Sequence, residues 1–194
     1  MKCMPAFVTL AAFIGPALAQ HGGHGPASPY AGEQTRAIKS LSEDDIAELR
    51  RGGGWGLAKA AELNGVPGPA HLMELKDALA LNDEQAAAIG EIFATMKADA
   101  IAEGERLIGH EQALGDAFRT REVTHESLRR LLARIEQSRA ALRYIHLAAH
   151  LSASALLTED QIARYVTLRG YGDPCANGPE GHDPAMWRRH NGCE

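Results

Sequence analysis

The chain has 194 residues, a formal net charge of -5 and only 5% aromatic residues. That length is enough for one modest domain with a hydrophobic core. Its apolar residues are mainly Ala and Leu, which favours helices packed on helices over a β-sheet. The net acidity argues against a general nucleic-acid-binding protein, which normally presents a basic face.

Residues 1–19 have the features of a cleavable signal peptide. Lys2 supplies the positive charge, residues 6–14 are apolar but too short to span a bilayer, and Ala17-Leu18-Ala19 fits a cleavage site. We therefore expect export and a mature chain that begins near Gln20. The Gly- and Pro-rich residues that follow predict a flexible tail over 20–40, in which His21 and His24 are a weak metal-binding signal.

Cleavage would remove Cys3 and leave two cysteines, Cys175 and Cys193. In an oxidising compartment such a pair usually forms a disulfide. We therefore predict a bridge that closes the C-terminal tail, residues 172–194, into a loop. The alternative is a metal-binding thiol pair.

Helical segments follow one another from residue 41 onward. Two short helices are predicted within 41–68, one at 41–51 capped by Ser42 and one at 55–63. A third is expected at 71–79. Apolar spacings of three and four then predict two long helices, about 83–118 and 125–151, and a final helix covers about 158–169.

The two long segments differ in charge, because the first is rich in Asp and Glu and the second in Arg. A short turn at 120–124 would make them antiparallel, and opposite charges on their flanks would favour pairing. The predicted fold is all-α: a long antiparallel helical hairpin with shorter flanking helices, short N-terminal helices and a disulfide-closed C-terminal tail.

A five-residue pattern recurs at the starts of two predicted helices, at 81–85 and 157–161. In each copy a cap residue accepts from first-turn amides, and a Gln three residues later reaches back to the cap residue's own N–H. The pattern is therefore first a device for starting helices. Its defining residues are Leu81, Asn82 and Gln85 in the first copy and Leu157, Thr158 and Gln161 in the second.

These two copies, separated by long helices and preceded by a signal peptide, resemble the paired LTxxQ motifs of the CpxP/Spy/CnrX/ZraP family. The first copy departs from the motif by having Asn82 in place of Thr. The resemblance covers the unit 69–171 and implies a periplasmic, usually dimeric protein with a four-helix fold. Members of the family act as chaperones, restrain sensor kinases, or bind and report transition metals.

His146 and His150 are four residues apart on the second long helix, so both imidazoles project from one face and can share a metal. His71 and Glu74, on the first helix of the unit, are predicted to face them across the bundle. Three imidazoles and a carboxylate suit Cu, Zn, Ni or Co. The alternative is that the two histidines are polar, partly solvated side chains beside the helix seam.

The C-terminal tail holds a secondary candidate site, because three potential ligands are spaced four residues apart: His182, Met186 and His190. A thioether with imidazoles suits copper. The alternative is a disulfide-closed tail in which Trp187 packs on the bundle. No phosphate-binding loop or nucleophile elbow is recognisable, so no enzymatic activity is expected.

The sequence thus predicts a periplasmic metal-responsive protein that senses or buffers transition metal ions. The alternative is a metal-independent chaperone or an adaptor of an envelope stress sensor. Expected partners are a second copy of the chain, a membrane sensor kinase, an anti-sigma factor or an unfolded envelope protein, and no nucleic acid.

Overall fold

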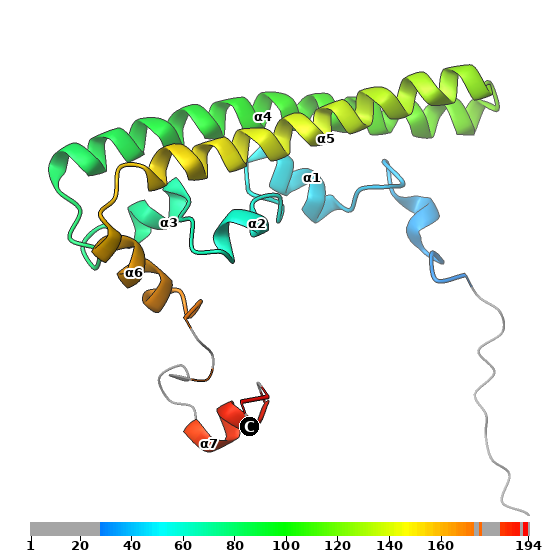
Figure 1. The fold of residues 1–194 in the computed structure, drawn as a ribbon. Coiled ribbons are helices and arrows are strands. Elements are labelled where there is room, and N and C mark those ends of the chain that lie inside the picture. The colour runs from blue at the N-terminus through cyan, green and yellow to red at the C-terminus, as the bar shows by residue number, and fades with distance from the viewer. Residues whose placement is uncertain (1–27, 173–174, 176–182, 191, 194) are drawn as a thin grey trace, which may run out of the picture. The chain divides into compact units, whose positions relative to one another are not determined.

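A computed structural model describes residues 28–172, 175, 183–190 and 192–193 (Figure 1). Regular structure in these residues is entirely helical, which confirms the predicted fold class at that level. The chain divides into two units, residues 1–32 and 33–194. Of the first unit, residues 28–32 are described and form a turn. The predicted signal peptide, His21, His24 and His182 lie outside the described residues.

The second unit begins with a 3-10 helix, Glu33–Thr35, which precedes seven α-helices in the described residues. Their bounds are α1 Glu43–Arg50, α2 Lys59–Glu62, α3 Pro69–Glu74, α4 Asp83–Thr120, α5 His125–Ser154, α6 Glu159–Leu168 and α7 Pro184–His190. In these ranges no helix is both long enough and apolar enough to cross a lipid bilayer.

The short helices are shorter than the sequence predicts. The prediction of a helix from residue 55 is wrong, because Trp55 and Gly56 have φ of 44° and 69°. Such left-handed backbone cannot continue a right-handed helix, so α2 begins only at Lys59. After α3 the backbone forms turns, and Ala80 with φ 50° precedes the start of α4.

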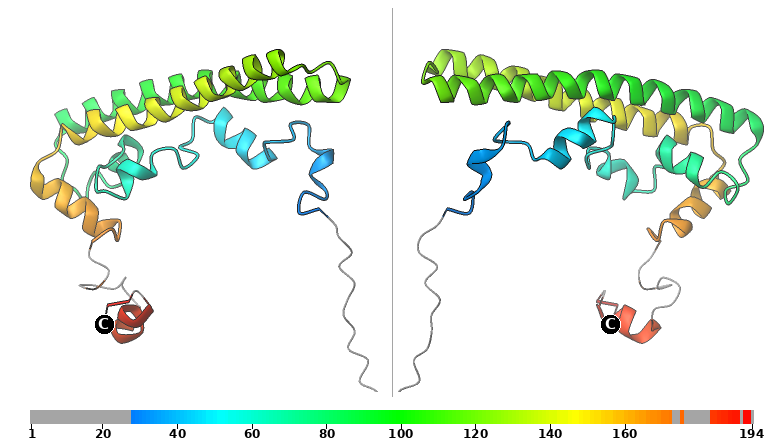
Figure 2. Two further views of the ribbon diagram at one scale, coloured as in Figure 1. Left: turned by 45° about the vertical axis from the view of Figure 1, so that its right-hand side comes forward. Right: turned by 180° about the vertical axis from the view of Figure 1, so that it is seen from behind.

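The long helices α4 and α5 lie side by side and are joined by residues 121–124 at one end of the pair (Figures 1 and 2). A half-buried ion pair connects them, since Arg139 Nη2 donates to the buried Glu111 Oε1 over 2.7 Å. This contact is of the kind that the opposite charges of the two segments predict. At the connection, the backbone of Arg121 has a left-handed conformation, which ends α4. Thr124 and Ser127 then form a capping box that begins α5.

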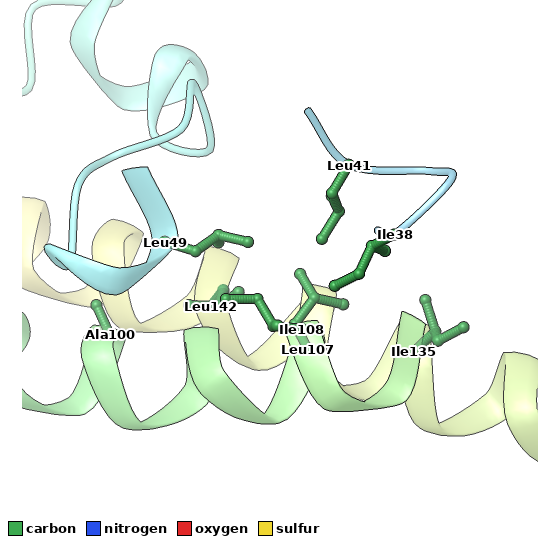
Figure 3. Packing of buried hydrophobic residues seen from close by; sticks show 8 residues of the cluster. All are labelled: Ile38, Leu41, Leu49, Ala100, Leu107, Ile108, Ile135 and Leu142. Carbon is green, nitrogen blue, oxygen red and sulfur yellow. The ribbon is translucent and has the colours of Figure 1, made fainter. Parts of the chain in front are cut away.

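One hydrophobic core lies where α1 meets the long pair (Figure 3). Gly104 allows this approach, because a Cβ at that position would lie 2.8 Å from the Leu49 carbonyl oxygen. The side chains of the core come from the segment before α1, from α1 and from both long helices: Ile38, Leu41, Leu49, Ala100, Leu107, Ile108, Ile135 and Leu142.

A second core joins α3, α4, α5 and α6, and its buried members are Leu72, Leu79, Ile89, Ala153 and Tyr165. Both five-residue patterns lie beside it and form complete capping boxes at the starts of α4 and α6. They also bind each other, since Gln85 Nε2 donates to Gln161 Oε1 over 2.9 Å and to the Leu156 carbonyl over 2.7 Å. The two helix starts are therefore tied together.

The predicted disulfide between Cys175 and Cys193 is present, and it closes a segment with a sequence separation of 18. Within this segment lies α7, on which Met186 and His190 are exposed. Because His182 lies outside the described residues, the geometry of the secondary candidate site is not described.

Candidate functional site

His146 and His150 lie one turn apart on α5, and both are buried, with 3% and 8% of their surface exposed. The alternative that these histidines are partly solvated is therefore wrong. Both imidazoles line a cavity of about 380 Å³. Its other walls are the Gly-rich segment 51–54, residues around α2, the start of α3, and the α4 side chains Phe93, Met96 and Lys97.

The His150 imidazole is held by the turn between α2 and α3. Its Nδ1 lies 2.8 Å from the Val66 carbonyl oxygen. Since a carbonyl only accepts, Nδ1 carries the proton, and in the neutral ring Nε2 keeps a lone pair. Gly68 makes room for the ring, because a Cβ at that position would lie 2.4 Å from His150 Nε2.

His146 has an unusual electrostatic environment. Burial lowers its pKa and the neighbouring His150 lowers it further, while a hydrogen bond to the Gly53 backbone acts in the opposite direction. The imidazole is therefore neutral near pH 7, which is the form that binds metal ions. Its Nε2 is buried and has no hydrogen-bond partner in the described part of the chain.

Glu62, the last residue of α2, is a buried carboxylate in the same cavity, with 8% of its surface exposed. Its Oε1 accepts hydrogen bonds from Tyr165 over 2.6 Å and from Tyr171 over 3.0 Å. The same oxygen lies 3.1 Å from His71 Nδ1 and 3.3 Å from Arg169 Nε. Four groups therefore converge on one oxygen atom.

The other oxygen of Glu62, Oε2, is buried and lacks a hydrogen-bond partner among the described residues. It lies 4.0 Å from His150 Nδ1. Burial by itself would raise the pKa of Glu62, but the hydrogen bonds from Tyr165 and Tyr171 and the nearby charges lower it below its usual value. The carboxylate is therefore ionised at neutral pH.

Of the predicted metal ligands, His71, His146 and His150 all line the cavity. His71 nevertheless faces α6 and the residues after it, with Nδ1 3.3 Å from the Tyr165 hydroxyl and Nε2 3.4 Å from Arg169 Nη2. Glu74 is exposed at the end of α3 and does not line the cavity. The carboxylate beside these histidines is Glu62 instead.

Sequence reasoning missed Glu62 because α2 has too few residues to show a periodic pattern. The available signal was the run from Asn64 to Pro69, whose glycines and prolines bring the backbone close to another part of the chain. In the described residues no three His, Cys, Asp or Glu side chains are grouped closely enough to hold a metal ion. The ready donors are therefore the two histidines of α5.

No protein-family model, curated protein or solved structure matches this chain. Two buried imidazoles and an ionised carboxylate line the same cavity, but among the described residues they are not grouped closely enough to hold a metal ion without side-chain movement.

Proposed function

We propose that this chain is a periplasmic protein of the CpxP/Spy/CnrX/ZraP type that binds a transition metal ion in the cavity and thereby senses or buffers it. In this proposal α3 to α6 form the family's four-helix unit around an antiparallel hairpin, and the protein is a homodimer. The metal would be Cu, Zn, Ni or Co.

One observation carries the proposal: two histidines one turn apart are buried against a cavity, and His150 is held by a hydrogen bond to a backbone carbonyl. Backbone carbonyls often fix metal-binding imidazoles in this way, because they set the tautomer and the orientation of the ring. The uncommitted Nε2 atoms of His146 and His150 are the proposed ligands. Glu62 and His71 would complete the site after side-chain movement, and the Met96 thioether in the wall favours copper.

The test is calorimetric titration of the mature, oxidised protein with Cu(II), Zn(II), Ni(II) and Co(II). We expect stoichiometric binding, and loss of at least about a hundredfold in affinity in the His146→Ala/His150→Ala variant, since removing ligands costs more than removing their supports. His125→Ala, at an exposed position at the start of the same helix, is the matched control. Equal affinities for the wild-type and double-variant proteins would exclude this site.

The tail is tested in the same experiment through the triple variant His182→Ala/Met186→Ala/His190→Ala. We expect its affinity to equal that of the wild-type protein. Binding that disappears only in this variant would assign the metal to the tail rather than to the cavity.

A second candidate function is a metal-independent chaperone for envelope proteins. It is favoured by large apolar side chains exposed on the long pair, including Phe118 at 55% and Leu151 at 67%. Suppression of client aggregation that is unaffected by a chelator would support this function. Aggregation unaffected by the protein would count against it.

A further inference from the structure

The helix α6 and the residues after it contact the cavity residue Glu62, in addition to the contacts of α6 with the second core. Tyr165 of α6 is fully buried, and its hydroxyl donates to Glu62 Oε1. The residues after α6 add Tyr171, which donates to the same oxygen, and Arg169, which lies 3.3 Å from it. The segment 165–171 therefore docks on a carboxylate that also faces the cavity.

The cavity is incomplete as a metal site in this arrangement. A tetrahedral transition metal usually takes three or four protein ligands, and α5 offers two. The other donors in the wall are Glu62 and His71, and both have their nitrogen or oxygen atoms directed at Tyr165 and Arg169. Of the polar side-chain atoms of Glu62 and His71, Glu62 Oε2 alone has no hydrogen-bond partner in the described ranges.

From these contacts we infer that metal binding and the docking of α6 compete for the same two side chains, Glu62 and His71. The inference rests on the proposed function and gives it a mechanism. When a metal draws Glu62 Oε1 toward His146 and His150, the hydrogen bonds from Tyr165 and Tyr171 are lost. When it draws His71, the contacts of that imidazole with Tyr165 and Arg169 are lost. The metal-loaded protein then holds 165–171 less firmly than the empty one.

Competition of this kind is reciprocal. A ligand that loosens α6 must bind more tightly when α6 is already loosened, because coupling between two sites acts equally in both directions. The chain continues from α6 into the disulfide-closed segment 175–193. Looser docking of 165–171 would therefore loosen the tether of that C-terminal segment.

The direct test is the metal affinity of Tyr171→Phe, measured by calorimetry. This variant removes one hydrogen bond to Glu62 but keeps the ring, and Tyr171 is only partly buried, so the fold should be retained. We expect affinity to rise about tenfold, because one hydrogen bond to a charged group no longer opposes binding. Tyr144→Phe is the matched control, since Tyr144 is exposed on α5 and does not line this cavity.

The second readout is amide hydrogen exchange of the wild-type protein with and without bound metal. We expect faster exchange over 159–168 on metal binding and unchanged exchange over 105–118 of α4. The competition is excluded if metal binding does not change the exchange of α6 and if Tyr171→Phe binds metal with the same affinity as the wild-type protein. Water would then complete the coordination sphere. If the wild-type protein binds no metal, both the proposed function and the competition are wrong.

Discussion

Gly68 controls the position of His150, although neither residue is near the other in sequence. Its missing side chain leaves the space that the imidazole fills, and the neighbouring Val66 carbonyl orients the ring. Gly68 has extended backbone with φ of -91°, so it is required by close packing and not by its dihedral angles. Glycine is therefore required at position 68 because the His150 ring occupies the space that a side chain would fill.

We predict that Gly68→Ala destabilises the protein and weakens metal binding together. The new Cβ would lie 2.4 Å from His150 Nε2, so the ring or the turn must move. Overpacking of this kind costs about 1–3 kcal/mol. Urea unfolding followed by circular dichroism, together with metal titration, measures the two effects.

Gly90→Ala is the control for that substitution. Gly90 lies inside α4, and a Cβ there would have no atom within 4 Å. Replacing an unhindered helical Gly by Ala should stabilise the protein by about 0.5–1 kcal/mol. If Gly68→Ala instead behaves like Gly90→Ala, the packing of His150 is looser than the structure shows.

At the scale of elements, each five-residue pattern both starts a helix and ties that helix to another. Gln85 accepts from the Asn82 N–H at the helix start and donates to Leu156 and Gln161 across the end of the pair. Gln161 in turn lies 3.4 Å from the Leu79 carbonyl. A simple capping residue makes only the first of these contacts.

Gln85→Ala should therefore cost more stability than loss of a cap alone. We expect about 2 kcal/mol, compared with about 1 kcal/mol for Ser127→Ala, whose contacts in the start of α5 are local. Chemical denaturation of both variants measures the difference. The double variant Gln85→Ala/Gln161→Ala should cost less than the sum of its parts, and full additivity would contradict the link between the patterns.

The starts of α1, α4, α5 and α6 could be predicted from the sequence because a cap and its partner lie three residues apart. The long helices were also predictable, since a 3.6-residue period repeats many times along them. The conformation of segment 52–69 could not be predicted, because it depends on tertiary contacts. One example is the close approach of Gly52 to α4, where a Cβ on Gly52 would lie 2.8 Å from the Lys97 carbonyl oxygen. The spacing that identified His146 and His150 is local in sequence. Which carboxylate lies beside them, Glu62 or Glu74, is instead decided by tertiary packing.

For the molecule as a whole, the buried site makes folding stability depend on pH. In the folded protein the pKa of His146 lies below its ordinary value of 6.5. In the unfolded chain the imidazole is exposed and takes up a proton more readily, so lowering the pH through 6.5 favours unfolding. The stability that neutral His146 contributes is present above this pH and is lost as the pH falls toward the folded pKa.

We therefore predict that the metal-free protein loses stability between pH 7 and pH 5.5, with a slope of up to about 1.4 kcal/mol per pH unit. His146→Gln should reduce this slope, and the exposed-site variant His125→Gln should leave it unchanged. Denaturation curves across this range provide the measurement. Glu62 does not contribute here, because its pKa is also lowered and its effect is confined to pH values near and below 4.5. A slope equal in all three proteins would contradict the assigned role of His146.

The contacts around Glu62 and His150 join residues separated by 84 to 109 positions in the chain. A nascent or partly folded chain can form its capped helices, since their signals are local, but it has no cavity until four distant segments have docked. The proposed metal affinity would therefore be a property of the completed fold alone. By mass action, a bound ion would then act as quality control, because it stabilises correctly assembled molecules and leaves incomplete ones to proteolysis.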